Sequence, residues 1–179
     1  DIGCGGGLVC EPMARLGANV TGIDADQNAI HTARDHAKDS SLTIDYQCAS
    51  TDDLTQRKKT YDVVLALEII EHVTDPQKFV SDIAKLCKPS GIIIFSTINR
   101  TPKSFALAKM AAEYILGWVP KGTHDWNKFV KPSELSRMVR HTGGHVKNIE
   151  GLVYNPFSGE FSRNAHDVDV NYFLCHLKV

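Results

Sequence analysis

Two carboxylates and an imidazole stand within five positions of the chain, at Glu68, Glu71 and His72. They follow residues 61–67, a nearly continuous apolar run that is typical of a parallel strand buried on both faces. On a turn of helix, the three side chains would project to one side. They could then hold a hard cation such as Mg²⁺ or supply a general base. The alternative is that Glu68 and His72 bind loop backbone and only maintain the shape of the site.

A glycine-rich loop opens the chain. Residues 1–7 read Asp-Ile-Gly-Cys-Gly-Gly-Gly, the end of a buried strand followed by a turn. Because Gly3 and Gly5 carry no Cβ atom, a ligand can approach the main chain closely. The third glycine of the dinucleotide fingerprint is missing, which disfavours a dehydrogenase. The next predicted strand ends in Asp24, whose carboxylate could accept hydrogen bonds from ribose hydroxyls. The loop and the acid together predict a nucleotide-type site.

The elements expected to position these residues alternate between strand and helix. The patterns predict strands at 19–24, 42–47, 61–67 and 91–98, and helices at 9–16, 26–38 and 75–86. Such alternation is typical of a parallel sheet with helices on both faces. Ligands of these sheets bind beyond the carboxyl ends of the strands, so the glycine loop, Asp24 and Glu68 are expected to line one crevice. The expected fold class is therefore α/β and doubly wound.

Length, charge and cysteine content restrict the architecture and the partners. The 179 residues are enough for a single domain, residues 1–179, with a substantial core. A net charge of −1 and a pI near 6.8 give no electrostatic reason to expect a nucleic acid partner. Five scattered cysteines without a CxxC pair indicate reduced thiols and not a disulfide frame or a zinc site. Because the chain opens on Asp1 already inside a strand, its N-terminal part is expected to be missing.

An insertion is expected at 101–131, where a doubly wound domain would pass briefly to its next helix. Within it, residues 104–119 read as a helix with a broad apolar surface and a narrow polar stripe, which is typical of a helix lying on a membrane. The alternative is a lid that buries this surface over a substrate cleft, and both hold if the substrate is a lipid. His124, beside Asp125, is a second candidate proton acceptor or else part of a loop-capping pair.

Several motifs together resemble those of one enzyme family. They are DIGCGGG, TGID, YDVV, EIIEHV, PKGTHDW, GLVYNP and VNY. Over nearly its whole length the chain is similar to the ubiquinone (coenzyme Q) biosynthesis O-methyltransferases, which are class I S-adenosylmethionine-dependent methyltransferases. The resemblance implies a seven-stranded Rossmann-like sheet whose last strand is antiparallel, with the helical insertion after strand 5. Strands at 145–152 and 170–179 would form the closing hairpin.

The resemblance also implies an activity. Family members transfer a methyl group from S-adenosylmethionine to phenolic hydroxyls of 2-polyprenyl-6-hydroxyphenol and of 3-demethylubiquinol. Carried over by motif, cofactor binding falls on Gly3, Asp24 and Leu67, and Gly5 belongs to the same loop. Family members also use an arginine upstream of the glycine loop, at a position that would precede Asp1.

A metal site is implied as well. The Mg²⁺ site of the family would correspond to Glu68, Glu71 and His72. A phenol has a pKa near ~10, so it is a poor nucleophile at neutral pH until a base or a cation stabilises the phenolate. Either the metal at this cluster or His72 alone as the base could supply that stabilisation. Glu68 and His124 are the further catalytic candidates.

The position after the third predicted strand is ambiguous. Many class I methyltransferases have an acid there that meets the adenine amino group, but this chain has Ser50, with Asp52 two residues later. The alternative is that both residues cap a short surface helix.

The partners implied by the family are a polyprenylated phenol or quinol substrate, a membrane surface bound through 104–119, and other ubiquinone-biosynthesis proteins. The implied location is the cytoplasmic face of a bacterial inner membrane or the matrix side of the mitochondrial inner membrane.

Two rival interpretations remain: a methyltransferase acting on another small or lipid acceptor, such as a menaquinone precursor methylated at carbon, and a non-catalytic, methyltransferase-like lipid-binding subunit. The PKGTH segment argues against the first, and Asp24 with the EIIEH segment argues against the second.

Overall fold

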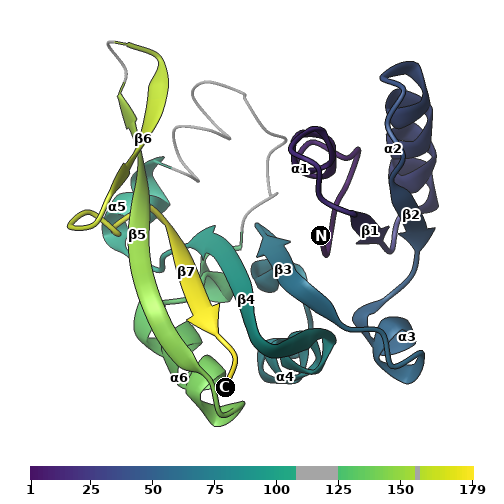
Figure 1. Cartoon of the computed structure of the whole chain (residues 1–179). Coiled ribbons are helices and arrows are strands. Elements are labelled where there is room, and N and C mark those ends of the chain that lie inside the picture. The colour runs from purple at the N-terminus through teal and green to yellow at the C-terminus, as the bar shows by residue number, and fades with distance from the viewer. Residues whose placement is uncertain (108–124, 156–157) are drawn as a thin grey trace.

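The core of the structure is a mixed β-sheet (Figure 1). The structure is a computed structural model that describes residues 1–107, 125–155 and 158–179. The strands are β1 (Thr21–Asp24), β2 (Asp45–Cys48), β3 (Tyr61–Leu67), β4 (Cys87–Ile98), β5 (His145–Asn155), β6 (Glu160–Asn164) and β7 (Asn171–Leu177). β1 pairs with β2, and the other strands follow the order β3-β4-β7-β5-β6.

Residues Asp1 and Ile2 join the two parts of this sheet. Ile2 forms a parallel bridge with Ile23 of β1, and its amide donates a hydrogen bond to the carbonyl oxygen of Leu65 in β3 at 2.9 Å. The amide of Ile23 donates to the carbonyl oxygen of Asp1, also at 2.9 Å. The sheet therefore runs β2-β1-(residues 1–2)-β3-β4-β7-β5-β6, with β7 antiparallel to both of its neighbours. The predicted doubly wound sheet with an antiparallel last strand is confirmed.

The helices lie between strands along the chain, and several begin after a capping side chain. They are α1 (Cys10–Arg15), α2 (Gln27–Asp39), α3 (Thr51–Gln56), α4 (Pro76–Leu86), α5 (Pro102–Ser104) and α6 (Pro132–His141). The side chain of Asp26 accepts a hydrogen bond from the amide of Asn28, and that of Asp75 accepts one from the amide of Lys78. Both residues open helices that the sequence predicts, at 26–38 and 75–86, and a carboxylate there satisfies amides that have no partner in the first turn.

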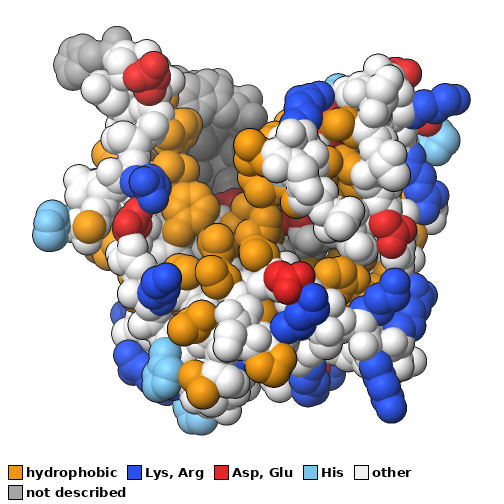
Figure 2. Space-filling view, viewed as in Figure 1, with side chains coloured by type: hydrophobic (Ala, Val, Ile, Leu, Met, Phe, Trp, Pro, Cys, Tyr) orange, Lys and Arg blue, Asp and Glu red, His pale blue; other side chains and the backbone are white. Residues whose placement is uncertain are grey.

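The main core lies between the sheet and the helices α4 and α6, which pack against each other below β3, β4 and β7 in Figure 1. Side chains that are fully buried there include Ile83, Leu86, Phe95, Leu135 and Leu174. Burial of such side chains supplies most of the stabilising free energy of a domain. On the face toward the viewer, hydrophobic side chains gather from α1 across the middle of the sheet (Figure 2).

Two features of the strands were not predicted from the sequence, the early start of β4 and the presence of β6. β4 begins at Cys87 because this residue already pairs with Tyr61, and the next paired residues are Ile92 and Val63, so the intervening part of β4 bulges. β6 was not predicted from the sequence. All five of its residues are exposed and it pairs with β5 at the edge of the sheet, so no buried face imposes an apolar alternation on it.

The insertion is anchored where its two ends meet. α5 lies at the start of the insertion, directly after Thr101. A 3₁₀ helix, η3 (Trp126–Lys128), lies near its end. The indole nitrogen of Trp126 donates a hydrogen bond to the carbonyl oxygen of Thr101 at 3.2 Å, and its ring meets that of Phe105 edge to face. The start and the end of the insertion are thereby held together.

The middle of the insertion, residues 108–124, lies outside the described residues. The predicted membrane-contact helix at 104–119 falls mainly there, and so does His124. Within the part of the chain that the structure describes, no helix is long and apolar enough to cross a membrane.

Candidate functional site

The glycine loop has backbone angles that favour glycine. Gly3, Gly5 and Gly7 all lie in the left-handed region, with φ of +73°, +50° and +89°. A Cβ atom on Gly7 would lie 2.2 Å from the hydroxyl oxygen of Tyr46, and one on Gly3 would lie 2.3 Å from Cδ1 of Ile69. The loop is therefore packed tightly against Ile69 at Gly3 and against Tyr46 at Gly7. Nothing lies within 4 Å of the Cβ position at Gly5, so a ligand can approach the main chain there.

Asp24 is tied to this loop. Its Oδ2 accepts a hydrogen bond from the amide of Gly5 at 2.9 Å, and its Oδ1 accepts one from the amide of Asp26 at 2.9 Å. Each carboxylate oxygen has a further lone pair, so the group can still accept hydrogen bonds from ribose hydroxyls. The structure thus brings together the loop and the acid that the sequence predicted as one nucleotide-type site.

Gly7→Ala is expected to lower both the stability and the affinity for S-adenosylmethionine, because the new methyl group would overlap the hydroxyl of Tyr46. The matched control is Gly17→Ala. Gly17 has a similar φ of +91° but nothing within 4 Å of the added carbon, so this variant should lose only about 1 kcal/mol to backbone strain. Urea unfolding and calorimetric titration with the cofactor measure the two effects. Equal losses in both variants would contradict the role given to the contact between Gly7 and Tyr46.

Glu68 leaves β3 in a left-handed conformation. Its φ is +51°, and its amide donates to the carbonyl oxygen of Ser96 in β4 at 3.0 Å. The carboxylate Oε1 accepts two hydrogen bonds, from Oγ of Ser96 at 2.6 Å and from Nδ2 of Asn171 at 2.9 Å. Glu68 is therefore fixed at the carboxyl end of β3 by residues from β4 and β7.

Glu71 lies in the 3₁₀ helix η1 (Ile70–His72) and is buried. Its Oε2 accepts a hydrogen bond from Oγ1 of Thr97 at 2.8 Å. Burial, together with the negative charge of Glu68, raises the pKa of Glu71 to about 7. A large part of this carboxyl population is therefore protonated near neutral pH.

The expected arrangement of Glu68, Glu71 and His72 on one helical turn was wrong. The helix η1 begins only at Ile70, and Glu68 precedes it with a positive φ. The carboxylate of Glu71 is buried against Thr97, whereas His72 is exposed. Among the described residues, no group of three histidine, cysteine or acidic side chains is placed to hold a metal ion. Glu68, Glu71 and His72 therefore do not form the predicted three-ligand magnesium site in this arrangement.

Leu67 lies at the end of strand β3, and the Ser50 segment follows strand β2. Leu67 is the last residue of β3 and pairs with Ser96, so it lies at the carboxyl end of this strand, next to Glu68 in the sequence. Ser50 caps α3 in a reciprocal capping box with Asp53, and Asp52 forms an ion pair with Lys78. The capping interpretation is confirmed for Ser50, whereas Asp53 and not Asp52 is the other member of the capping box.

Three polar residues that contact Glu68 or Glu71 were not predicted from the sequence. Ser96 and Thr97 were included in a buried strand without a role, and Asn171 was only part of a motif. A usable signal existed for the first two, because adjacent polar residues near the carboxyl end of an otherwise apolar strand often face a site. Asn171 has no such local signal, since 103 positions separate it from Glu68.

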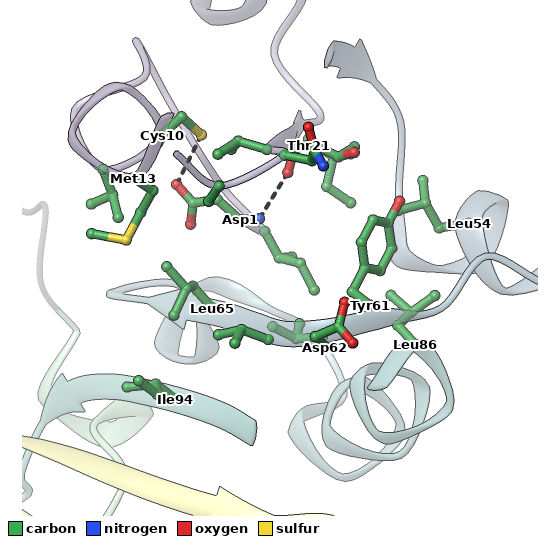
Figure 3. Close-up of a pocket in the computed structure, with 18 residues that line it drawn as sticks. Asp1, Cys10, Met13, Thr21, Leu54, Tyr61, Asp62, Leu65, Leu86 and Ile94 are labelled. Atoms are coloured by element: carbon green, nitrogen blue, oxygen red, sulfur yellow. Dashed lines mark hydrogen bonds between the residues drawn. The ribbon is translucent and has the colours of Figure 1, made fainter. Parts of the chain in front are cut away.

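A pocket of about 430 Å³ lies elsewhere, between α1, the start of β1 and the first part of β3 (Figure 3). It is mostly apolar, with Met13, Val63, Leu65 and Ile94 in its lining. The nitrogen of Asp1 donates to the carbonyl oxygen of Thr21 at 2.9 Å in its wall. Neither Asp24 nor Glu68 lines the pocket, so it is separate from the site at the carboxyl ends of the strands.

Comparison with known proteins agrees with this geometry. Residues 1–95 match the family model described as a methyltransferase domain. The ubiquinone biosynthesis O-methyltransferase of Cereibacter sphaeroides is 49% identical over 178 residues, which are 99% of this chain and 72% of that protein. The enzyme of the same name from Rickettsia akari is 49% identical over 175 residues, which are 98% of this chain and 69% of that protein.

Solved structures agree in fold. The magnesium protoporphyrin IX methyltransferase of Synechocystis, solved with bound S-adenosylhomocysteine, superposes with a TM-score of 0.74 at 20% identity, over 100% of this chain and 73% of that chain. This likeness shows a methyltransferase fold of the Rossmann-like type. Together with the sequence identities, it establishes that the chain belongs to the ubiquinone biosynthesis O-methyltransferase family.

Proposed function

We propose that this protein transfers a methyl group from S-adenosylmethionine to a phenolic hydroxyl of polyprenylated ubiquinone precursors, namely 2-polyprenyl-6-hydroxyphenol and 3-demethylubiquinol. The observation that carries the proposal is the hydrogen bond between Asp24 and the amide of Gly5, which joins the acid and the glycine loop in one site. Family membership supplies the class of acceptor.

The cofactor end of the site is assigned to the glycine loop, Asp24 and Leu67. The main chain at Gly3 and Gly5 would lie against the methionine part of the cofactor, where side chains are absent. The carboxylate of Asp24 would accept hydrogen bonds from the ribose hydroxyls. When bound, S-adenosylmethionine supplies an electrophilic methyl group on a sulfonium centre.

The acceptor end is assigned to the residues that follow β3. The phenolic oxygen forms its bond to the methyl carbon as the carbon–sulfur bond breaks, and its proton must pass to a base. The exposed imidazole of His72 is the proposed base, and the carboxylate of Glu68 is the proposed hydrogen-bond acceptor that orients the hydroxyl. His124 stays a candidate base outside the described residues.

The insertion is proposed to meet the lipid tail of the substrate. The apolar surface expected for 104–119 suits contact with a membrane surface, which would place the enzyme at the cytoplasmic face of a bacterial inner membrane or at the matrix side of the mitochondrial inner membrane. Association with other ubiquinone-biosynthesis proteins would follow from a shared lipid substrate. These assignments rest on the sequence pattern and the family resemblance.

The direct test is methyl transfer from labelled S-adenosylmethionine to a short-chain 3-demethylubiquinol by the full-length protein. The control acceptor is the corresponding ubiquinol, in which the target hydroxyl is already methylated and only the two quinol hydroxyls are free, and it should receive no label. Label on the quinol oxygen supports the proposal. Cofactor binding without transfer to this quinol, or transfer to the carbon of a menaquinone precursor instead, would contradict it.

An arm with EDTA tests the requirement for Mg²⁺ that the resemblance implies. Loss of turnover with EDTA and recovery with Mg²⁺ would support a metal-dependent reaction, with ligands beyond the arrangement described for Glu68, Glu71 and His72. Turnover that is indifferent to EDTA would leave the activation of the phenol to protein side chains alone.

A further inference from the structure

Asn171 makes a contact with Glu68 that no local pattern of the sequence predicts. Its Nδ2 donates to Oε1 of Glu68 at 2.9 Å, and Oγ of Ser96 donates to the same oxygen at 2.6 Å. Both donors therefore converge on one carboxylate oxygen. Among the described residues, no hydrogen-bond donor meets the other oxygen, Oε2, which is left for a ligand.

The segment that carries Asn171 is itself firmly held. The amide of Asn99 donates to the carbonyl oxygen of Val170 at 2.8 Å, and Nδ2 of Asn99 donates to that of Val168 at 2.8 Å. Oγ1 of Thr101 donates to the carbonyl oxygen of Asp169 at 2.6 Å. These bonds fix the entry into β7, so the amide of Asn171 is presented from a rigid element and not from a free loop.

The conformation of Glu68 needs such support. A non-glycine residue at φ +51° is in an unfavourable region, which persists only when surrounding contacts stabilise it. Ser96 contributes through both its carbonyl and its hydroxyl, and Asn171 contributes from the opposite strand. The Oδ1 atom of Asn171 is buried and has no hydrogen-bond partner, which lowers the stability of the fold. The side chain therefore contributes through its Nδ2 donor and not through its oxygen.

We propose that Asn171 is a positioning residue for the acceptor, acting through Glu68. By binding Oε1 together with Ser96, it directs Oε2 of Glu68 to the phenolic hydroxyl that is to be methylated. This inference rests on the proposed function of the site. It goes beyond it by assigning the orientation of the acceptor to a residue of β7 that does not touch the cofactor residues Gly5 and Asp24.

The test compares Asn171→Ala and Asn171→Asp with the wild-type full-length protein. Both variants remove the donor, and the second preserves the size of the side chain in case the first fails to fold. We expect kcat with short-chain 3-demethylubiquinol to fall about 10- to 100-fold, because small misplacements of a reacting group have effects of this order. The dissociation constant for S-adenosylmethionine should stay unchanged.

Two controls separate positioning from a structural role. Asn148→Ala removes a similar amide–carboxylate bond, from Nδ2 of Asn148 to Oε1 of Glu150 at 2.6 Å, on an exposed part of β5, and should leave kcat unchanged. The double variant of Asn171→Ala with Glu68→Gln should be no slower than Glu68→Gln alone, because both changes affect one contact.

The outcomes distinguish the two proposals. An active wild type in which the effects of Asn171→Ala and Glu68→Gln multiply, or in which Asn171→Ala weakens cofactor binding as much as it lowers kcat, would overturn the positioning role alone. A wild type that binds the cofactor but does not methylate the quinol would overturn the proposed function and, with it, this inference.

Discussion

Replacing Asp24 with alanine is expected to weaken the binding of S-adenosylmethionine about 100-fold, because hydrogen bonds from hydroxyls to a charged acceptor contribute up to about 3 kcal/mol. The variant also removes the bond from the amide of Gly5 at 2.9 Å, whereas the amides of Gly3 and Cys4 still donate to the carbonyl oxygen of Ile23 in β1. Calorimetric titration with the cofactor measures the change.

A nearby carboxylate provides the control for Asp24. Asp26 caps α2 through the amide of Asn28, and Asp26→Ala should lower the free energy of unfolding by about 1 kcal/mol without changing cofactor affinity. An Asp24→Ala variant that folds and binds the cofactor as well as the wild type does would show that the ribose is held elsewhere.

The Glu71 carboxyl is expected to make the free energy of unfolding fall as the pH rises. Its pKa is raised from the ordinary value of 4.5 to about 7, chiefly by burial and then by Glu68. The native state therefore holds this proton more tightly than the unfolded state does. The stabilisation that the bound proton gives the native state is fully present below the unfolded pKa. It is lost as the pH rises between the two pKa values, and the full loss is about 3 kcal/mol.

Glu71→Gln should abolish this dependence. An amide oxygen can still accept the hydrogen bond from Thr97, but it never ionises. Relative to the wild type, the variant should gain about 3 kcal/mol between about pH 5 and about pH 8. Urea unfolding in the presence of EDTA at both pH values measures the difference and removes any effect of bound metal.

The same stabilisation at both pH values would contradict the assignment. In that case the carboxyl of Glu71 would titrate at its ordinary value and the gain would come from packing. Asp53 offers a comparison, because its pKa is lowered by hydrogen bonds from the backbone and the side chain of Ser50 and it is exposed. Its variant Asp53→Asn should show no gain as the pH rises.

Local features of the fold could be read from neighbouring residues. Helices were predicted to open at Asp26 and Asp75, and both residues are N-caps in the structure, because a helix start depends on a few consecutive residues. The glycine loop and Asp24 were predicted as one site for a related reason. The turn that follows a parallel strand and the end of the next strand have a nearly invariant relation in a doubly wound sheet.

The arrangement of the acidic cluster could not be predicted in this way. Spacing placed Glu68, Glu71 and His72 on one helical turn, whereas the structure begins the helix after Glu68. The left-handed conformation of Glu68 depends on Ser96, which is 28 positions away, and on Asn171, which is 103 positions away. Tertiary contacts of this kind outweigh the weak preference of a short segment for helix.

The sequence by itself therefore determined the fold class, the family and the closeness of the glycine loop to Asp24, since each depends on local patterns or on similarity along the chain. Only the tertiary structure decided which side chains surround Glu68 and that Glu71 is buried with a raised pKa. The physical reason is that the pairing of β3, β4 and β7 sets the distances between these residues, and burial and hydrogen bonding follow from those distances.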